Sequence, residues 1–287
     1  KINGHAIEAR LYAENVEAGF LPSTGRLNIL NLPELPDDEV RVDAAVEQGD
    51  VISPFYDPMI AKVIAHGATR SEALMTLARD WRTIDVWPVK TNAGFVLRCL
   101  GDARFAAGDV DTALIGSRGD ALTKPPAPSA KALSSAYLAL KYAMDAPGPR
   151  GPRPPHLLAS PWKKLTGFRL NASPITRGAL RFQGDRVEFE LDEAVGRSAV
   201  RGDRAIVFED GEAYEFTLDT GERAEGEEAA GDGAILSPMP GKIVSVAAKA
   251  GAKLKKGDPI LVLEAMKMEH TLTAPFDGKL AELNAKA

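Results

Sequence analysis

The chain has 287 residues, of which 45% are hydrophobic and 26% are charged, as in an ordinary globular protein with room for one to three domains. Its net charge of −5 argues against a nucleic-acid or anionic-membrane partner. No apolar run approaches the length of a membrane span, and the single cysteine excludes an internal disulfide framework and is typical of a reducing compartment. The first residues resemble the interior of a longer polypeptide, so we expect the chain to be a piece of one, without a signal peptide.

Residues 1–118 have a mixed α/β pattern. Alternation predicts strands in "HAIEARLYA" and "EVRVDAAVEQGDVI", and the β-branched run "MIAKVIAHG" predicts another strand. Thr69 and Glu72 form a capping-box pattern that opens a helix over "TRSEALMTLARDW". Further helices are expected within 90–100 and in "DARFAAGD" and "DTALIG". Cys99 falls in the apolar run "FVLRCL" and is expected to be a buried, inert thiol.

A Pro-, Ala- and Ser-rich segment at 119–131 predicts a linker before a helix that begins at residue 132. One face of that helix is apolar, formed by Leu133, Tyr137, Leu140 and Met144. Two interpretations stay open for this face: it docks a partner subunit, the interpretation we favour, or it packs into its own domain. Tyr137→Asp would separate them.

Period-two patterning then predicts a meander of hairpins up to residue 220. Turns are expected at "QGD", "RGD" and "EDGE", so the Arg-Gly-Asp tripeptide at 201–203 is interpreted as a hairpin turn rather than an adhesion motif. Residues 221–234 are acidic and rich in Gly and Ala, which predicts a second linker.

Residues 235–287 contain an internal repeat. The unit "GKIVSVAAKA" begins at Gly241, and a second copy, "GKLAELNAKA", begins at Gly278. Two copies of one strand unit predict a quasi-two-fold β structure. The second copy stops at Ala287, where the next Gly is expected, so the domain is expected to be incomplete at its C-terminus.

Lys267 lies between the two copies, at the turn joining the strands expected in "PILVLEA" and "MEHTLTAP". An exposed amine on a rigid hairpin suits a covalent carrier, and Met266 and Met268 offer polarizable contact surface beside it. The alternative without a special function is a surface lysine beside two core-facing methionines. The repeat and the turn position favour the carrier.

These residues carry a family resemblance. The segment "EAMKMEH", with its flanks "SPMPGKIV" and "TAPFDGKL", resembles the biotinylation motif of biotin carboxyl carrier domains. Lipoyl domains share the repeat, but their lysine is usually flanked by Asp and Ala, a pattern absent here. The resemblance implies that Lys267 is amide-linked to biotin by a separate biotin protein ligase.

The segments "GHAIEARLYAEN", "FLPSTGRL" and "SPFYDPMIAKVIAHG" resemble the C-terminal subdomain of biotin carboxylase, an ATP-grasp enzyme. This implies that Arg10 reaches the active site near bicarbonate and the biotin ureido oxygen. Glu8 shares a strand face with Arg10, so an ordinary surface ion pair is the competing interpretation. The sequence has no glycine-rich phosphate loop after a strand and no metal-ligand cluster, so ATP and Mg or Mn are expected to bind an upstream part of the parent.

Residues 132–220 resemble the domain that joins the carboxylase and carboxyltransferase parts of acyl-CoA carboxylase α subunits, and "SPWKKLTGFRLN" favours the 3-methylcrotonyl-CoA branch of leucine degradation. The expected fold is multidomain α+β. Its parts are a carboxylase subdomain (1–118), a linker (119–131), a joining domain of a helix and an antiparallel β-barrel (132–220), a second linker (221–234) and a truncated biotinyl β hammerhead (235–287).

The resemblance implies carboxylation of biotin on Lys267 and delivery of CO2 to a carboxyltransferase β subunit that acts on the acyl-CoA. A hetero-oligomer is expected, in the cytoplasm of a bacterium or the mitochondrial matrix of a eukaryote. The alternatives are a non-catalytic scaffold and carrier, or the α subunit of a propionyl-CoA or other acyl-CoA carboxylase. A biotin-dependent decarboxylase would require a large barrel domain, for which the chain has no room.

Overall fold

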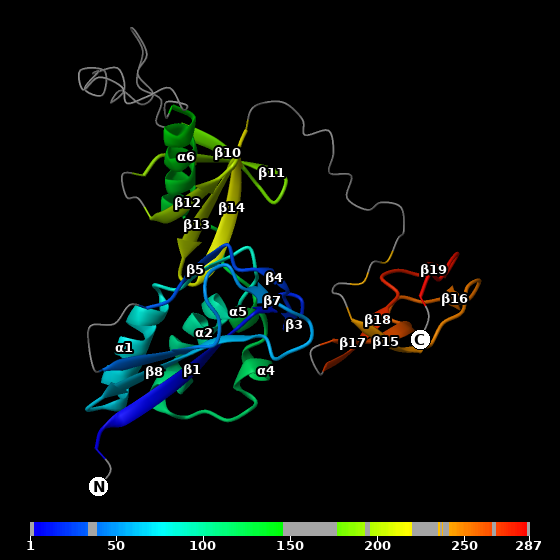
Figure 1. Ribbon diagram of the computed structural model, residues 1–287, viewed down its shortest axis with the longest axis horizontal. Coiled ribbons are helices and arrows are strands. Elements are labelled where there is room, and N and C mark those ends of the chain that lie inside the picture. The colour runs from blue at the N-terminus through cyan, green and yellow to red at the C-terminus, as the bar shows by residue number, and fades with distance from the viewer. Residues whose placement is uncertain are drawn as a thin grey trace. The chain divides into compact units, whose positions relative to one another are not determined.

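The computed structural model describes residues 3–33, 39–145, 177–192, 196–219, 235, 237, 241–265 and 268–285. The chain divides into two compact units. One is formed by Lys1–Pro125 together with Glu228–Ala287, and the other by Pro126–Glu227 (Figure 1). None of the helices in the described ranges has both the length and the apolar character needed to cross a membrane.

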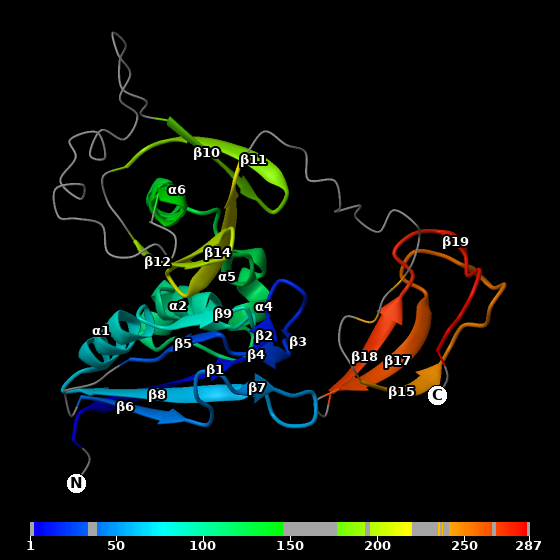
Figure 2. The ribbon, with the colours of Figure 1, turned by 45° about the horizontal axis from the view of Figure 1, so that its top comes forward.

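The N-terminal part is built on a three-stranded antiparallel sheet in the order β1 (His5–Tyr12), β8 (Met59–Gly67), β6 (Val40–Ala44). Alternation along the strands gives the sheet an apolar face, because Ile7, Leu11 and Val63 are buried. Figure 2 shows the helices α1 and α2 on one side of this sheet. Six short strands form three further pairs: β2 (Glu14–Asn15) with β3 (Leu21–Pro22), β4 (Gly25–Arg26) with β7 (Val51–Ile52), and β5 (Ile29–Asn31) with β9 (Asp85–Trp87).

Helix α1 (Arg70–Trp81) begins as the sequence predicts. Thr69 Oγ1 accepts a hydrogen bond from Glu72 N at 3.2 Å. Glu72 Oε2 accepts from Ala68 N at 2.9 Å, one residue before the N-cap, so the reciprocal bond of the capping box is displaced by one position. Leu77 and Trp81 are fully buried, and Trp81 Nε1 donates to a carbonyl in the next helix, which fixes α1 against it.

Thr69→Ala removes the bond that caps α1 and should lower the free energy of unfolding by about 1 kcal/mol. Ser71→Ala is the matched control, because Ser71 is exposed and lies two residues after Thr69. This substitution should change the free energy of unfolding by less than about 0.5 kcal/mol. Urea denaturation followed by tryptophan fluorescence measures both, since Trp81 and Trp87 lie in this part of the chain. Equal losses in the two variants would contradict the capping role.

Four helices follow in the order α2 (Ala93–Leu100), α3 (Ala103–Ala107), α4 (Leu114–Arg118) and α5 (Asp120–Thr123). The first three lie where periodicity placed helices. Helix α5 lies inside the segment expected to be linker. Leu122 is its anchor: it is 4% exposed, it packs with Phe95, and its carbonyl accepts from Arg98 Nε at 2.6 Å. The burial of Leu122 therefore fixes the start of a segment whose composition indicates a linker.

The second unit combines helix α6 (Ala130–Asp145) with a five-stranded antiparallel sheet. The predicted hairpins and their turns are confirmed, but the strands do not form a simple meander. The strand Arg177–Phe182 pairs with Glu212–Leu218, and the consecutive strands Asp185–Glu190 and Arg197–Arg201 lie at opposite edges of the sheet. Gln183 and Gly184, and likewise Asp210 and Gly211, have positive φ at the two central turn positions, as type I′ hairpins require. The Arg-Gly-Asp tripeptide turns the β12–β13 hairpin. The strand order is β11 (Asp185–Glu190), β10 (Arg177–Phe182), β14 (Glu212–Leu218), β13 (Arg204–Glu209), β12 (Arg197–Arg201).

The apolar face of α6 packs into its own domain, so the expectation that it docks a partner is wrong. Leu133 and Leu140 are buried in one cluster with Leu180 and Phe216 of the sheet. Tyr137 meets Phe189 edge to face, with ring centroids 6.1 Å apart. The exception is Met144, which is 68% exposed. The helix and the sheet therefore share one apolar core.

Buried hydroxyls also bind α6 to the segment that follows β11. Ser134 Oγ accepts from Asp192 N at 2.8 Å, and Ser135 Oγ accepts from Gly196 N at 2.6 Å. The helix packs against all five strands, although the described strands end at β11 and β12 and do not close into a barrel (Figure 1).

The C-terminal segment forms a three-stranded sheet in the order β15 (Lys242–Val246), β17 (Pro259–Ala265), β18 (Met268–Thr273), and a second pair, β16 (Lys253–Leu254) with β19 (Gly278–Lys279). The internal repeat has a structural counterpart. Ile243 and Val246 of the first copy pack with Leu261 and Leu263, whereas the matching Leu280 and Leu283 of the second copy pack around Ile260 and Ala274. Each copy also supplies an alanine to the other core, because Ala248 packs with Ile260 and Ala274, and Ala285 packs with Leu261 and Leu263.

Candidate functional sites

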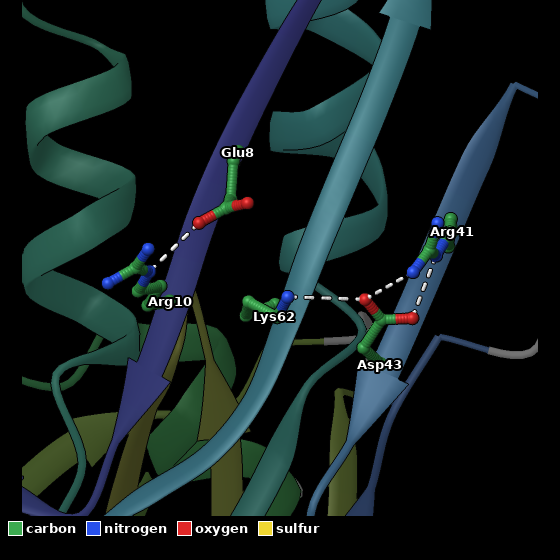
Figure 3. A network of polar contacts seen from close by, with 5 residues as sticks. All are labelled: Glu8, Arg10, Arg41, Asp43 and Lys62. Atoms are coloured by element: carbon green, nitrogen blue, oxygen red, sulfur yellow. Dashed lines mark hydrogen bonds and ion pairs between the residues drawn. The ribbon is translucent and has the colours of Figure 1, made fainter.

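Arg10 lies on the outward face of β1 with its side chain 56% exposed. Its Nε donates to Glu8 Oε1 at 2.8 Å, two residues away on the same strand face (Figure 3). The hydrogen bond that Arg10 donates to Glu8, and a smaller contribution from Tyr12, raise the pKa of the Arg10 guanidinium. The ion pair that competed with the catalytic interpretation is therefore present. Exposed pairs of this kind add little stability, and the guanidinium keeps its charge at every physiological pH.

A second ion-pair network occupies the neighbouring strands. Lys62 is the register partner of Arg10 on β8, but its Nζ lies 3.3 Å from Asp43 Oδ2 on β6 (Figure 3). Arg41 donates two hydrogen bonds to the same carboxylate, at 2.8 and 2.9 Å. The Arg41 hydrogen bond holds the pKa of Asp43 below its usual range. The outward face of the sheet thus carries two separate charge groups, Glu8–Arg10 and Arg41–Asp43–Lys62.

Two other titratable groups in this part have shifted pKa values. Burial, followed by the charge of Asp57, raises the pKa of Glu14. Burial raises the pKa of the Cys99 thiol to about 11, so it stays protonated near neutral pH. This is the behaviour expected of an inert thiol rather than a nucleophile.

The proposed carrier lysine lies beyond the paired ends of β17 and β18. Ala265 and Met268 are register partners, so the two residues between them, Met266 and Lys267, join the strands. These two residues lie outside the described residues, and the side chain of Met268 is not described either. What the structure does describe is an antiparallel hairpin that leads directly to them on both sides. The turn expected at Lys267 therefore falls on residues that the structure does not describe.

Arg10 and the hairpin come from segments that lie far apart in the sequence. Within the described ranges, no group of three or more His, Cys, Asp or Glu side chains is placed to hold a metal ion. Sequence reasoning missed one residue beside Arg10. Asn92, at the start of α2, forms hydrogen bonds with the backbone of β1.

Two known protein families match this chain. The biotin carboxylase C-terminal domain matches residues 8–117, and the biotin-requiring enzyme domain matches residues 233–287. Among solved structures, the biotin carboxylase subunit of pyruvate carboxylase aligns with 44% of this chain and 28% of that chain, at 29% identity and a TM-score of 0.42.

Full-length relatives cover the whole chain. The mitochondrial methylcrotonoyl-CoA carboxylase subunit alpha of Dictyostelium discoideum is 32% identical over 333 residues, which cover 99% of this chain and 46% of that protein. The mitochondrial propionyl-CoA carboxylase alpha chain of Sus scrofa is 30% identical over 331 residues, which cover 100% of this chain and 45% of that protein. The chain therefore spans a little under half the length of these relatives. The chain therefore contains a biotin carboxylase C-terminal domain and a biotin-requiring enzyme domain, and over its whole length it is similar to the α subunits of biotin-dependent acyl-CoA carboxylases.

Proposed function

We propose that this chain works within a biotin-dependent acyl-CoA carboxylase whose acyl substrate is 3-methylcrotonyl-CoA. The observation that carries the proposal is the presence, in one chain, of a biotin carboxylase C-terminal domain and a biotin-requiring enzyme domain. The choice of acyl-CoA follows the relatives in Dictyostelium discoideum and Arabidopsis thaliana, both named methylcrotonoyl-CoA carboxylase. ATP and Mg or Mn would be bound by a part of the enzyme that this chain does not contain.

The proposed organisation has three folded parts: residues 1–118, 132–220 and 235–287, joined at 119–131 and 221–234. The middle part is proposed to be the joining domain, with a β-barrel completed around α6, and the last part a biotinyl β hammerhead. Support comes from the packing of α6 against all five described strands and from the two repeat-related cores of the C-terminal segment. Among the described residues of the middle part, no group of three or more His, Cys, Asp or Glu side chains is placed to hold a metal ion, and we propose that this part positions the β subunit.

Lys267 is the proposed attachment site of biotin, and Met266 and Met268 are proposed to contact it and the modifying ligase. The local structure fits a covalent arm, because paired strands lead up to the lysine from both sides and the connection between them is only two residues long. When attached, biotin supplies the ureido nitrogen that takes up and releases CO2. The role of the chain is to hold that group on the β17–β18 hairpin and, because the hairpin is part of the same chain, to keep it at high effective concentration near both reaction centres.

Arg10 is the proposed catalytic residue of this chain. A fixed cation on the outward face of β1 would stabilise the negative charge that develops on the ureido oxygen when the adjacent nitrogen loses its proton. The hydrogen bond that Arg10 Nε donates to Glu8 restricts the position of the guanidinium. The bond to Glu8 does not use the two terminal nitrogens, so their N–H groups can still donate to the ureido oxygen. Localisation in mitochondria is proposed if the source is eukaryotic, because the named relatives are mitochondrial, and in the cytoplasm otherwise.

The proposal is tested with the complete carboxylase, its β subunit, ATP and isotope-labelled bicarbonate. Label should enter 3-methylcrotonyl-CoA faster than propionyl-CoA, and Lys267→Arg should abolish incorporation into both. Faster labelling of propionyl-CoA would move the chain to the propionyl-CoA carboxylases. The scaffold alternative predicts that label enters neither acyl-CoA while the complex still assembles, and that result would reject the catalytic proposal.

A further inference from the structure

Asn92 occupies the N-cap position of helix α2, yet its side chain does not cap that helix. Asparagine is among the preferred N-cap residues because its side-chain oxygen accepts from the first free N–H groups of a helix. Here the side chain turns away to a strand 80 residues earlier in the chain. Asn92 is 7% exposed, so these groups are withdrawn from water and depend on the bonds they make.

Three hydrogen bonds join Asn92 to the backbone of Arg10 and Tyr12 in β1. Asn92 Nδ2 donates to Arg10 O at 3.1 Å. Asn92 Oδ1 accepts from Tyr12 N at 2.9 Å, and Asn92 N donates to Tyr12 O at 3.2 Å. Among the strands that the structure describes, β1 is an edge strand of its sheet and pairs with β8. Asn92 therefore takes the place of a further strand on the free edge of β1, next to Arg10.

We propose that Asn92 is a positioning residue for Arg10. The inference rests on the proposed role of Arg10. The ladder with β8 becomes irregular between Leu11 and Tyr12, immediately after Arg10, so β8 alone holds this end of β1 less regularly. Asn92 fixes the backbone there from the other side, while Glu8 fixes the guanidinium end. Backbone and side-chain end together define where the charge of Arg10 lies.

The chemistry requires an amide at this position. One side chain must donate to a carbonyl and accept from an N–H group at the same time, and asparagine has both functions on one planar group. Aspartate can accept from Tyr12 N, but it has no donor for Arg10 O and places a negative charge against that oxygen. Asn92→Asp is therefore the more specific variant, because it keeps the size of the side chain but removes the donor to Arg10 O.

The test is a double-mutant cycle in the complete carboxylase, using Arg10→Ala, Asn92→Asp, Asn92→Ala and the double variants. Each Asn92 variant should lower kcat for biotin carboxylation about ten-fold, and leave KM for ATP unchanged, because a misplaced catalytic group costs rate rather than nucleotide binding. Asn31→Ala is the matched control. It removes a side-chain hydrogen bond to Asp85 in the same part of the fold, and it should leave kcat unchanged.

The decisive comparison is the double variant. If Asn92 acts through Arg10, Arg10→Ala/Asn92→Asp is no slower than Arg10→Ala alone. A further ten-fold loss in the double variant, or an equal loss of kcat in Asn31→Ala, would show a general structural role and overturn the inference. If Asn92→Ala does not fold, Asn92→Asp carries the cycle. An Arg10→Ala enzyme with full activity would reject the proposed role of Arg10 and this inference with it, whereas full activity of the Asn92 variants alone rejects only the inference.

Discussion

Replacing Arg10 by alanine in the complete carboxylase is expected to lower the rate of biotin carboxylation about 10²–10³-fold, the usual effect of removing one group that stabilises a developing oxyanion. The melting temperature is expected to stay within about two degrees of wild type, because the side chain is 56% exposed and its ion pair with Glu8 adds little stability. The assay follows ATP-dependent fixation of labelled bicarbonate on biotin, alongside a thermal melt of the same preparation.

Arg41→Ala is the matched control for Arg10. Arg41 also lies on the outward face of the sheet, also pairs with a carboxylate two residues away, and is 74% exposed. Its loss should leave the carboxylation rate unchanged and alter the melting temperature as little as the loss of Arg10 does. If the two variants lose activity equally, or if loss of activity follows loss of melting temperature, Arg10 is only a member of a surface ion pair.

A charge introduced into the buried face of α6 is expected to unfold the second unit. Leu140 is 3% exposed and packs with Leu180 and Phe216, so Leu140→Asp loses the burial of a leucine and places an unpaired carboxylate in an apolar core. The expected loss in the free energy of unfolding is at least about 3 kcal/mol. Limited proteolysis of residues 126–227 and circular dichroism measure it.

Tyr142→Asp is the control on the same helix. Tyr142 is 81% exposed, so the same charge there should change the free energy of unfolding by less than about 0.5 kcal/mol. A folded, protease-resistant Leu140→Asp protein that fails only to bind the β subunit would instead restore the docking interpretation of this helix face. Biotinylation of Lys267 should be retained in both variants, because the hairpin has its own small core.

Local sequence signals predicted much of the fold. The strands β1 and β8, the helix α1 and the three hairpins of the second unit have signatures contained within a few residues: alternation, a capping pattern, and glycine at turn positions that require positive φ. The repeat beginning at Gly241 and Gly278 was equally readable, and each of its two copies supplies apolar side chains to both small cores.

What the sequence could not provide was the identity of partners distant in the chain. The stripe on α6 shows that an apolar surface must cover it, but periodicity does not say whether that surface belongs to the same chain, and it proved to be the sheet of its own unit. Leu122 looked like one apolar residue in a linker until Phe95 was placed beside it.

Asn92 is the clearest example at a candidate site. An asparagine just before a predicted helix indicates an N-cap, and nothing in the neighbouring residues indicates a bond to a strand 80 residues away. Arg10, in contrast, was identified because it lies in a segment that resembles biotin carboxylase, although its partner Glu8 suggested an ordinary ion pair. Sequence reasoning could therefore name the charged group but not the residue that positions it.

Peptide mapping by mass spectrometry, on the chain isolated from cells that contain biotin and a biotin protein ligase, tests the central claim most directly. We expect one biotin per chain, attached to Lys267 and absent from the Lys267→Arg variant. Lys279→Arg is the control, because Lys279 is an exposed lysine on β19 in the second repeat copy and its loss should leave the modification intact. Biotin on any other lysine, or a mass that shows no biotin on the wild-type chain under these conditions, would contradict the assignment of Lys267 as the carrier residue.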